Sequence, residues 1–111
     1  MSTANERYEA ARMRWAKAAY LSVYDDPKVI KGILPDIRAA LEEDPRHVAA
    51  LVLLSELLME LGSYDGATQV VATLMALEPG VSEHRRKHDL LRTRDRNAIR
   101  DYVEGERLPR R

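Results

Sequence analysis

Two histidines, His84 and His88, stand four residues apart and would share one face of a helix. Imidazole nitrogens at this spacing can bind a transition metal such as Zn²⁺. The three residues between them are all basic, which opposes the approach of a cation, and no third ligand is evident nearer than Asp95, two turns further on. We therefore interpret this segment as a solvated polar helix face and expect no metal and no cofactor.

The last third of the chain also carries a set of basic residues that could contact the phosphates of a nucleic acid. Acidic residues interrupt the set, and no aromatic side chains interleave with it to stack on bases. Several of the bases have an acidic partner one helical turn away, as in Arg100–Glu104. Nucleic-acid binding is thus the weaker hypothesis, and docking of this arm onto acidic parts of the protein, within a chain or between chains, is at least as good an expectation. The set is Arg85, Arg86, Lys87, Arg92, Arg94, Arg96 and Arg100.

The sequence shows no pattern of a catalytic site. Cysteine is absent, which excludes disulfides, thiolate metal sites and a cysteine nucleophile. The chain has no glycine-rich phosphate loop, no Gly-x-Ser-x-Gly elbow and no His-Glu-x-x-His pair. The acidic clusters at residues 25–26 and 42–44 fall at predicted helix ends, where acids act as caps. We expect a protein without enzymatic activity.

Composition indicates one helical domain. The 111 residues are 45% apolar and 32% charged, an ordinary globular composition, and Ala and Leu supply most of the apolar surface. Residues 1–80 carry 8 Lys and Arg against 12 Asp and Glu, whereas residues 81–111 carry 10 against 6. The longest apolar run, residues 48–54, is far shorter than the roughly 20 residues of a membrane span. The polar N-terminal residues do not resemble a secretory signal, so we expect a cytoplasmic protein that does not enter a membrane.

Helical periodicity places these residues on about five helices. Asp26-Pro27 and Asp44-Pro45 are start signals, and Gly62 is a stop signal with the left-handed backbone of a C-cap. Pro35 predicts a kink or a restart near Leu34. The last segment is either one bent helix or two short helices that meet near Thr93. The expected helices span residues 3–24, 27–43, 45–61, 64–77 and 82–104.

The unit of residues 44–79 resembles a tetratricopeptide repeat, a helical hairpin of about 34 residues. Leu51, Leu54, Ser55 and Leu58 occupy the first-helix positions of that motif. Gly62 and Tyr64 match its Gly-x-Tyr turn, Ala67 its small residue at the helix crossing, and Pro79 its end. Residues 40–45 parallel residues 74–79 at a spacing of 34, so the preceding unit is a degenerate copy. Leu51 stands where the motif usually has a large aromatic residue, and Ser55 stands where it usually has Gly or Ala.

The resemblance implies an all-α fold of antiparallel hairpins stacked as a short solenoid with a C-terminal capping helix. Residues 1–104 would form one domain: a degenerate repeat at 1–43, a clear repeat at 44–79 and the capping helix at 80–104. Residues 105–111 would be a flexible basic tail.

The resemblance also implies a protein-interaction module or small adaptor whose concave groove is lined by the first helix of each repeat. The partner would be a protein or peptide segment with apolar anchors and a basic flank. Two alternatives stay open: the apolar stripe is ordinary core, or the repeat's faces pair two copies, since two repeats are fewer than the three or so needed for stability. The expected partner-binding residues are Trp15, Ala49, Val52, Leu53, Glu56, Met59 and Glu60.

Overall fold

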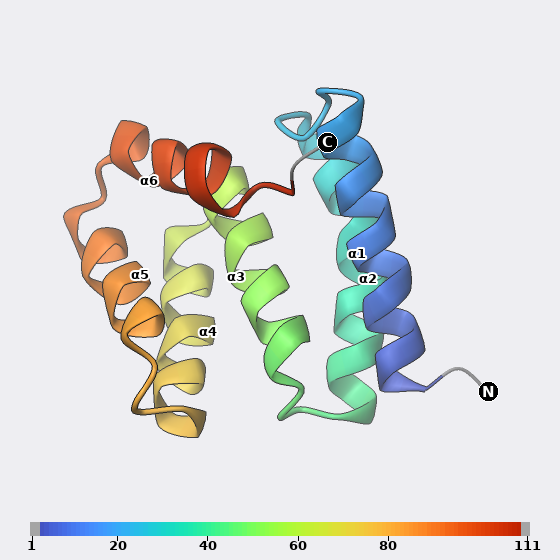
Figure 1. Ribbon diagram of the computed structural model, residues 1–111, viewed down its shortest axis with the longest axis horizontal. Helices are drawn as coiled ribbons and strands as arrows, with labels where there is room; N and C mark the ends of the chain where they lie inside the picture. The colour runs from blue at the N-terminus through green and yellow to red at the C-terminus, as the bar shows by residue number, and fades with distance from the viewer. Residues whose placement is uncertain (1–2, 110–111) are drawn as a thin grey trace.

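The computed structural model describes residues 3–109, and the described chain folds into six α-helices followed by one π-helical turn. Two antiparallel hairpins, α1–α2 and α3–α4, stand side by side, and α5 packs on α4 (Figure 1). The fold is therefore an all-α stack of helical hairpins, as predicted. The elements are α1 (Ala4–Tyr20), α2 (Pro27–Glu43), α3 (Val48–Leu61), α4 (Tyr64–Leu77), α5 (Ser82–Thr93), α6 (Arg96–Tyr102) and η1 (Val103–Arg107).

Helix α1 is shorter than the sequence predicts. Thr3 caps it through a reciprocal pair of hydrogen bonds with Glu6, a capping box. The helix ends at Tyr20 instead of residue 24 because Ser22 adopts a left-handed backbone conformation with φ of 59°. The amide of Val23 then bonds to the Ala18 carbonyl and reverses the chain direction.

Helix α2 keeps its predicted bounds, with Asp26 accepting a hydrogen bond from the Lys28 amide. It continues through Pro35 as one helix, so the predicted restart near Leu34 is wrong. The Arg14 guanidinium of α1 donates a hydrogen bond of 2.8 Å to the Gly32 carbonyl, close to where proline removes a backbone donor.

The hairpin of α3 and α4 is closed by Gly62, whose φ of 81° is the predicted left-handed C-cap. Ala67 is fully buried, and its small side chain lets α4 lie close to α3. The start of α3 differs from the prediction. The Asp44 side chain accepts from the Arg46 amide, and it is His47 whose ring nitrogen accepts from the Ala50 amide, so α3 begins at Val48 and not at residue 45.

The last third of the chain forms two helices, which confirms the second of the two alternatives. Arg94 has a φ of 52° and ends α5, and Asp95 then caps α6 by accepting from the Ala98 amide. Val81 is the cap residue of α5, which begins at Ser82. After α6 and η1 the chain passes across one end of α3 toward α1 (Figure 1).

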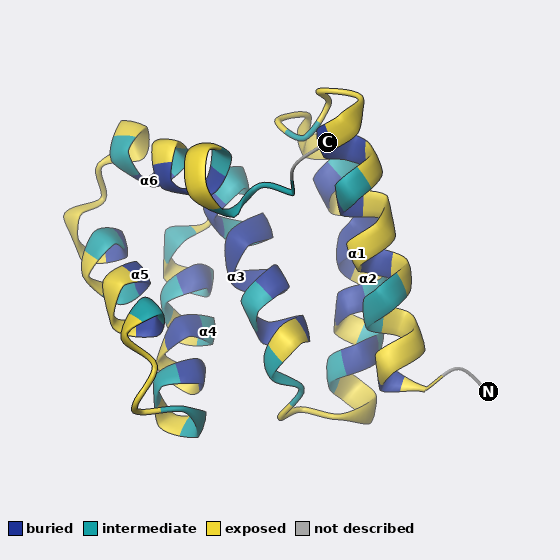
Figure 2. Ribbon diagram, in the orientation of Figure 1, coloured by how far each residue is buried: buried dark blue, intermediate teal, exposed yellow. Residues whose placement is uncertain are grey.

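Helix α3 is the centre of the fold and is buried along most of its length (Figure 2). On one side it joins a core cluster with α1 and α2 that contains Trp15, Ile33 and Leu53. On the other side it joins a cluster with α4, α5 and α6 that contains Met59 and Ile99. Every other part of the fold is therefore positioned relative to α3.

The end of the described chain corrects the prediction of a flexible tail over residues 105–111. Residues 105–107 belong to the turn η1, and Leu108 packs against the cluster of α1, α2 and α3. Arg110 and Arg111 lie outside the described residues. The boundaries predicted between repeats, after residues 43 and 79, stay predictions.

Candidate interaction surface

The residues predicted to line a groove divide into a buried group and an accessible group. Trp15, Leu53, Glu56 and Met59 are at most 6% exposed, so a partner cannot reach them in this conformation. Ala49 is exposed, and Val52 and Glu60 are half-buried. The surface open to a partner on α3 is thus narrower than expected. We call the side of α1 and α3 over which the C-terminal residues pass the inner face.

Glu56 is buried because two basic residues from distant parts of the chain cover its carboxylate. Lys87 of α5 places its Nζ 3.6 Å from Glu56 Oε1, and Arg107 of η1 places its Nε 2.5 Å from the same oxygen. Lys87 is itself fully buried and donates a hydrogen bond of 3.1 Å to Ser55 Oγ. We call Ser55, Glu56, Lys87 and Arg107 the charge cluster.

The charge cluster places a cation where few proteins have one, because lysine is almost never fully buried unless it is paired. Burial lowers the pKa of Lys87, since desolvation penalises the ammonium, while the charge of Glu56 opposes that change. The pairing with Glu56 therefore keeps this ammonium compatible with the interior and fixes α5 against α3.

The turn η1 is held against the helices by further polar contacts. Glu106 accepts a hydrogen bond of 2.7 Å from Arg86 of α5, whose guanidinium also lies over the ring of Tyr102. Tyr102 donates its hydroxyl hydrogen to Glu83 of α5. The segment after α6 is therefore a docked element with partners on both α3 and α5.

A second contact between α3 and the C-terminal residues joins two carboxyl groups. Glu60 and Glu104 share a hydrogen bond, which requires a proton on one of them. The pKa of Glu60 is raised from its ordinary value of 4.5 to about 7, and burial is the largest cause. The hydrogen bond with Glu104 and the negative charge of Glu104 raise it further, whereas the positive charge of Arg100 lowers it. Asp25, in the loop between α1 and α2, adds a small further increase.

This carboxyl pair predicts that stability falls as pH rises from about 5 to about 8. At pH values between the ordinary pKa of Glu60 and its raised pKa, the folded protein binds more protons than the unfolded chain. The resulting stabilisation of the folded state is present at low pH and is lost as pH rises through about 7. Urea unfolding of the wild type and of Glu60→Gln at several pH values measures it. The variant should show a flatter dependence, and equal slopes for the two proteins would contradict the assignment.

The basic arm is largely neutralised within the chain. Arg94 pairs with Asp65 of α4, Arg100 pairs with Glu104, and Lys87 is buried. His84 is buried and hydrogen-bonded to Glu78 at 2.8 Å, so this part of α5 is not the solvated face that the sequence predicts. Among residues 3–109 no three side chains form a group that could hold a metal ion.

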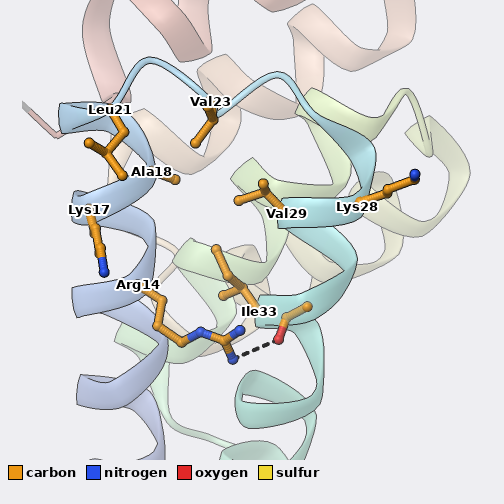
Figure 3. A pocket seen from close by; sticks show the side chains of 9 residues that line it. Arg14, Lys17, Ala18, Leu21, Val23, Lys28, Val29 and Ile33 are labelled. Carbon is orange, nitrogen blue, oxygen red and sulfur yellow. Dashed lines mark hydrogen bonds between the residues drawn. The ribbon is translucent and has the colours of Figure 1, made fainter.

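A second candidate surface lies between α1 and α2, away from α3, and the sequence did not reveal it. A pocket of about 310 Å³ opens there, with Val29 and Ile33 pointing from α2 toward α1 (Figure 3). Arg14 crosses the pocket to the Gly32 carbonyl (Figure 3). Most of the exposed large apolar side chains of the described chain lie on α1 or on the loop after it, and two of them, Leu21 and Val23, line this pocket. Those on α1 and the loop are Met13, Tyr20, Leu21 and Val23.

The charge cluster was also missed, although one of its members carried a signal. Glu56 is the only charged residue in the apolar run of residues 48–59, and such a lone acid in a buried helix requires a counter-ion. The partners gave no comparable signal. Lys87 stands in a wholly polar segment, and Arg107 stands in a tail that local sequence marks as irregular.

Comparison with known proteins agrees with this geometry. Residues 32–88, slightly more than half of the chain, match the model of a family described as tetratricopeptide repeat. The match runs from α2 through α3 and α4 into α5. No curated protein and no solved structure matches the chain. None of the helices within residues 3–109 has the length and apolar character needed to cross a bilayer.

Proposed function

This chain belongs to the tetratricopeptide repeat family, and from that premise we propose that it is a non-catalytic interaction module or small adaptor that binds a segment of another protein. Repeats of this family generally mediate protein–protein interactions and are typically non-catalytic. A cytoplasmic location, expected from the sequence, stays a prediction.

The proposed binding surface is the inner face of α1 and α3. One observation carries the proposal: a piece of protein, the chain's own residues 107–109, already lies across one end of this face. The other end of α3 carries Ala49 and Val52, which are accessible, and the C-terminal residues do not cross it (Figure 1). A partner segment lying along this face would bury apolar side chains against Val52.

A pair of matched alanine substitutions tests this surface. Ala49→Glu places a charge on the inner face, whereas Ala72→Glu places the same charge on the exposed side of α4. The partner is first identified by comparing the proteins that the wild type and the two variants capture, and it is then titrated in purified form. Ala49→Glu should weaken binding about tenfold or more, because glutamate must be desolvated against the partner, and Ala72→Glu should not. Equal affinities for the two variants would refute the inner face as the binding surface.

Self-association is the second candidate function, and the apolar residues around the α1–α2 pocket favour it. Leu21 and Val23, which line the pocket, are 54% and 38% exposed, and Met13 and Tyr20 of the adjoining helix α1 are each 63% exposed. A homodimer formed here would bury them. Sedimentation velocity discriminates: a dimer that resists dilution and that Leu21→Asp dissociates supports assembly, whereas a monomer supports the adaptor.

Nucleic-acid binding through the basic arm is the weakest of the three hypotheses, because Arg86, Arg94 and Arg100 already pair with acids of the same chain. A salt-dependent mobility shift with single-stranded or duplex probes would be needed to revive it.

A further inference from the structure

Residues 107–109 occupy the inner face in the manner of a bound peptide. Arg107 reaches the buried Glu56, which lies 51 positions earlier in the chain, and Leu108 enters the core cluster of α1, α2 and α3. Ala19 of α1 and Glu104 of η1 line a pocket together with Leu108 and Pro109, so the segment lies against α1 as well as α3. It thus presents a basic residue followed directly by a large apolar one.

From this arrangement we infer that residues 105–109 are an intramolecular ligand of the inner face, and that the partner protein displaces them with a segment of the same chemistry, an arginine or lysine followed by a large apolar residue. This inference rests on the proposed function. It adds the pair of residues that the inner face recognises in the partner, and it identifies residues 105–109 as the segment that competes with the partner.

The charge requirement comes from Glu56. Glu56 is 5% exposed. Lys87 of α5 balances part of the charge on its carboxylate. When Arg107 leaves, one face of a buried carboxylate loses its partner, and water or another cation must replace the guanidinium. A neutral or acidic partner segment would leave this group unsatisfied, which selects for a basic residue at that position.

The apolar requirement comes from the cluster that Leu108 joins. Leu53 and Trp15 belong to this cluster and are buried with the segment in place. Removing Leu108 would expose part of this cluster's apolar surface to water, so a competing segment must supply a comparable side chain. The basic residue and the apolar residue of the partner must be consecutive in its sequence, as Arg107 and Leu108 are.

The segment is also the part of the C-terminal region best suited to exchange. Tyr102 and Val103 are anchored in the core with α3, α4 and α5, whereas Gly105 and Glu106 are exposed and Arg107 to Pro109 are only half-buried. Few buried contacts hold residues 105–109, so they can open at a lower free energy than the helices. The anchor at residues 102–103 keeps the released segment near its site, which makes it an effective competitor.

A labelled peptide that copies residues 103–109 (Val-Glu-Gly-Glu-Arg-Leu-Pro) is the probe, and fluorescence anisotropy measures its binding to the full-length protein. Three proteins are compared: the wild type, Leu108→Asp, which weakens the internal ligand, and Val81→Asp, a comparable change at an exposed apolar residue of the loop between α4 and α5. Leu108→Asp should bind the probe at least about tenfold more tightly than the other two, because a larger fraction of its molecules has an open site. A probe with glutamate in place of arginine should lose this gain.

The outcomes separate the two proposals. If all three proteins bind the probe equally well, residues 105–109 are not a competitor and the inference fails, while the inner face remains a binding surface. If none binds it, the inference fails again, and the titration of Ala49→Glu with the identified partner decides the proposed function by itself. Should Leu108→Asp lose its helical circular dichroism, Arg107→Ala takes its place with the same expected gain.

Discussion

Replacing Glu56 by alanine should lower the free energy of unfolding by about 3–5 kcal/mol, the typical loss when one partner of a buried ion pair is removed. Lys87 is fully buried, and without Glu56 its ammonium would keep a single neutral partner, Ser55, at 3.1 Å. Arg107 would lose its contact at the same time. Urea unfolding followed by circular dichroism measures the loss.

Two further substitutions show whether this loss belongs to the charge cluster. Lys87→Met removes the buried ammonium and leaves Glu56 paired with Arg107, so it should destabilise the protein by less than half as much. Glu42→Ala removes an exposed acid of α2 and should change stability by no more than about 0.5 kcal/mol. If Glu56→Ala were as mild as Glu42→Ala, water would have to reach Lys87 in solution.

The second large effect is expected for Trp15→Ala, a loss of about 3–5 kcal/mol of unfolding free energy. Trp15 is 2% exposed and belongs to the core cluster between α1, α2 and α3, so truncation removes a large buried surface and leaves a cavity. A domain of this size has about 5–15 kcal/mol of stability in total, so the variant loses a large fraction of it.

This substitution also separates two roles that the sequence leaves open for Trp15. A core residue lowers stability when truncated, whereas a groove residue lowers affinity for the partner and leaves the unfolding midpoint in place. Met13→Ala is the matched control, because Met13 lies on the same helix and is 63% exposed. A Trp15→Ala protein as stable as Met13→Ala would place the indole on an accessible surface instead of in the core.

The elements that local sequence determines were predicted closely. Helix α2 begins where Asp26-Pro27 provides a cap and a preset backbone angle, and the α3–α4 turn lies where Gly62 permits positive φ. The early end of α1 was not predicted, because a residue with no special preference takes an unusual conformation there. Ser22 and Arg94 adopt left-handed backbone angles that the packing of the surrounding helices selects, and neither residue type indicates them.

The candidate site was harder to predict because its burial depends on contacts distant in sequence. Helical periodicity placed Leu53, Glu56 and Met59 on neighbouring turns of one helix. It could not show that α5 and the C-terminal residues cover Glu56 and Met59. The sequence from Gly105 onward is short and polar enough to resemble a solvent-exposed tail. The position of Leu108 against the cluster of α1, α2 and α3, and the contact of Arg107 with Glu56, show that this segment belongs to the fold.

The return of the chain across α3 has a consequence for how the molecule unfolds. In an open stack of repeats each unit contacts only its neighbours, so either end can melt independently. Here Arg107 and Leu108 join the last element to the first hairpin and to the central helix. Loss of either end therefore removes contacts of the other, which favours one all-or-none transition in a fold whose helices are otherwise arranged one after another.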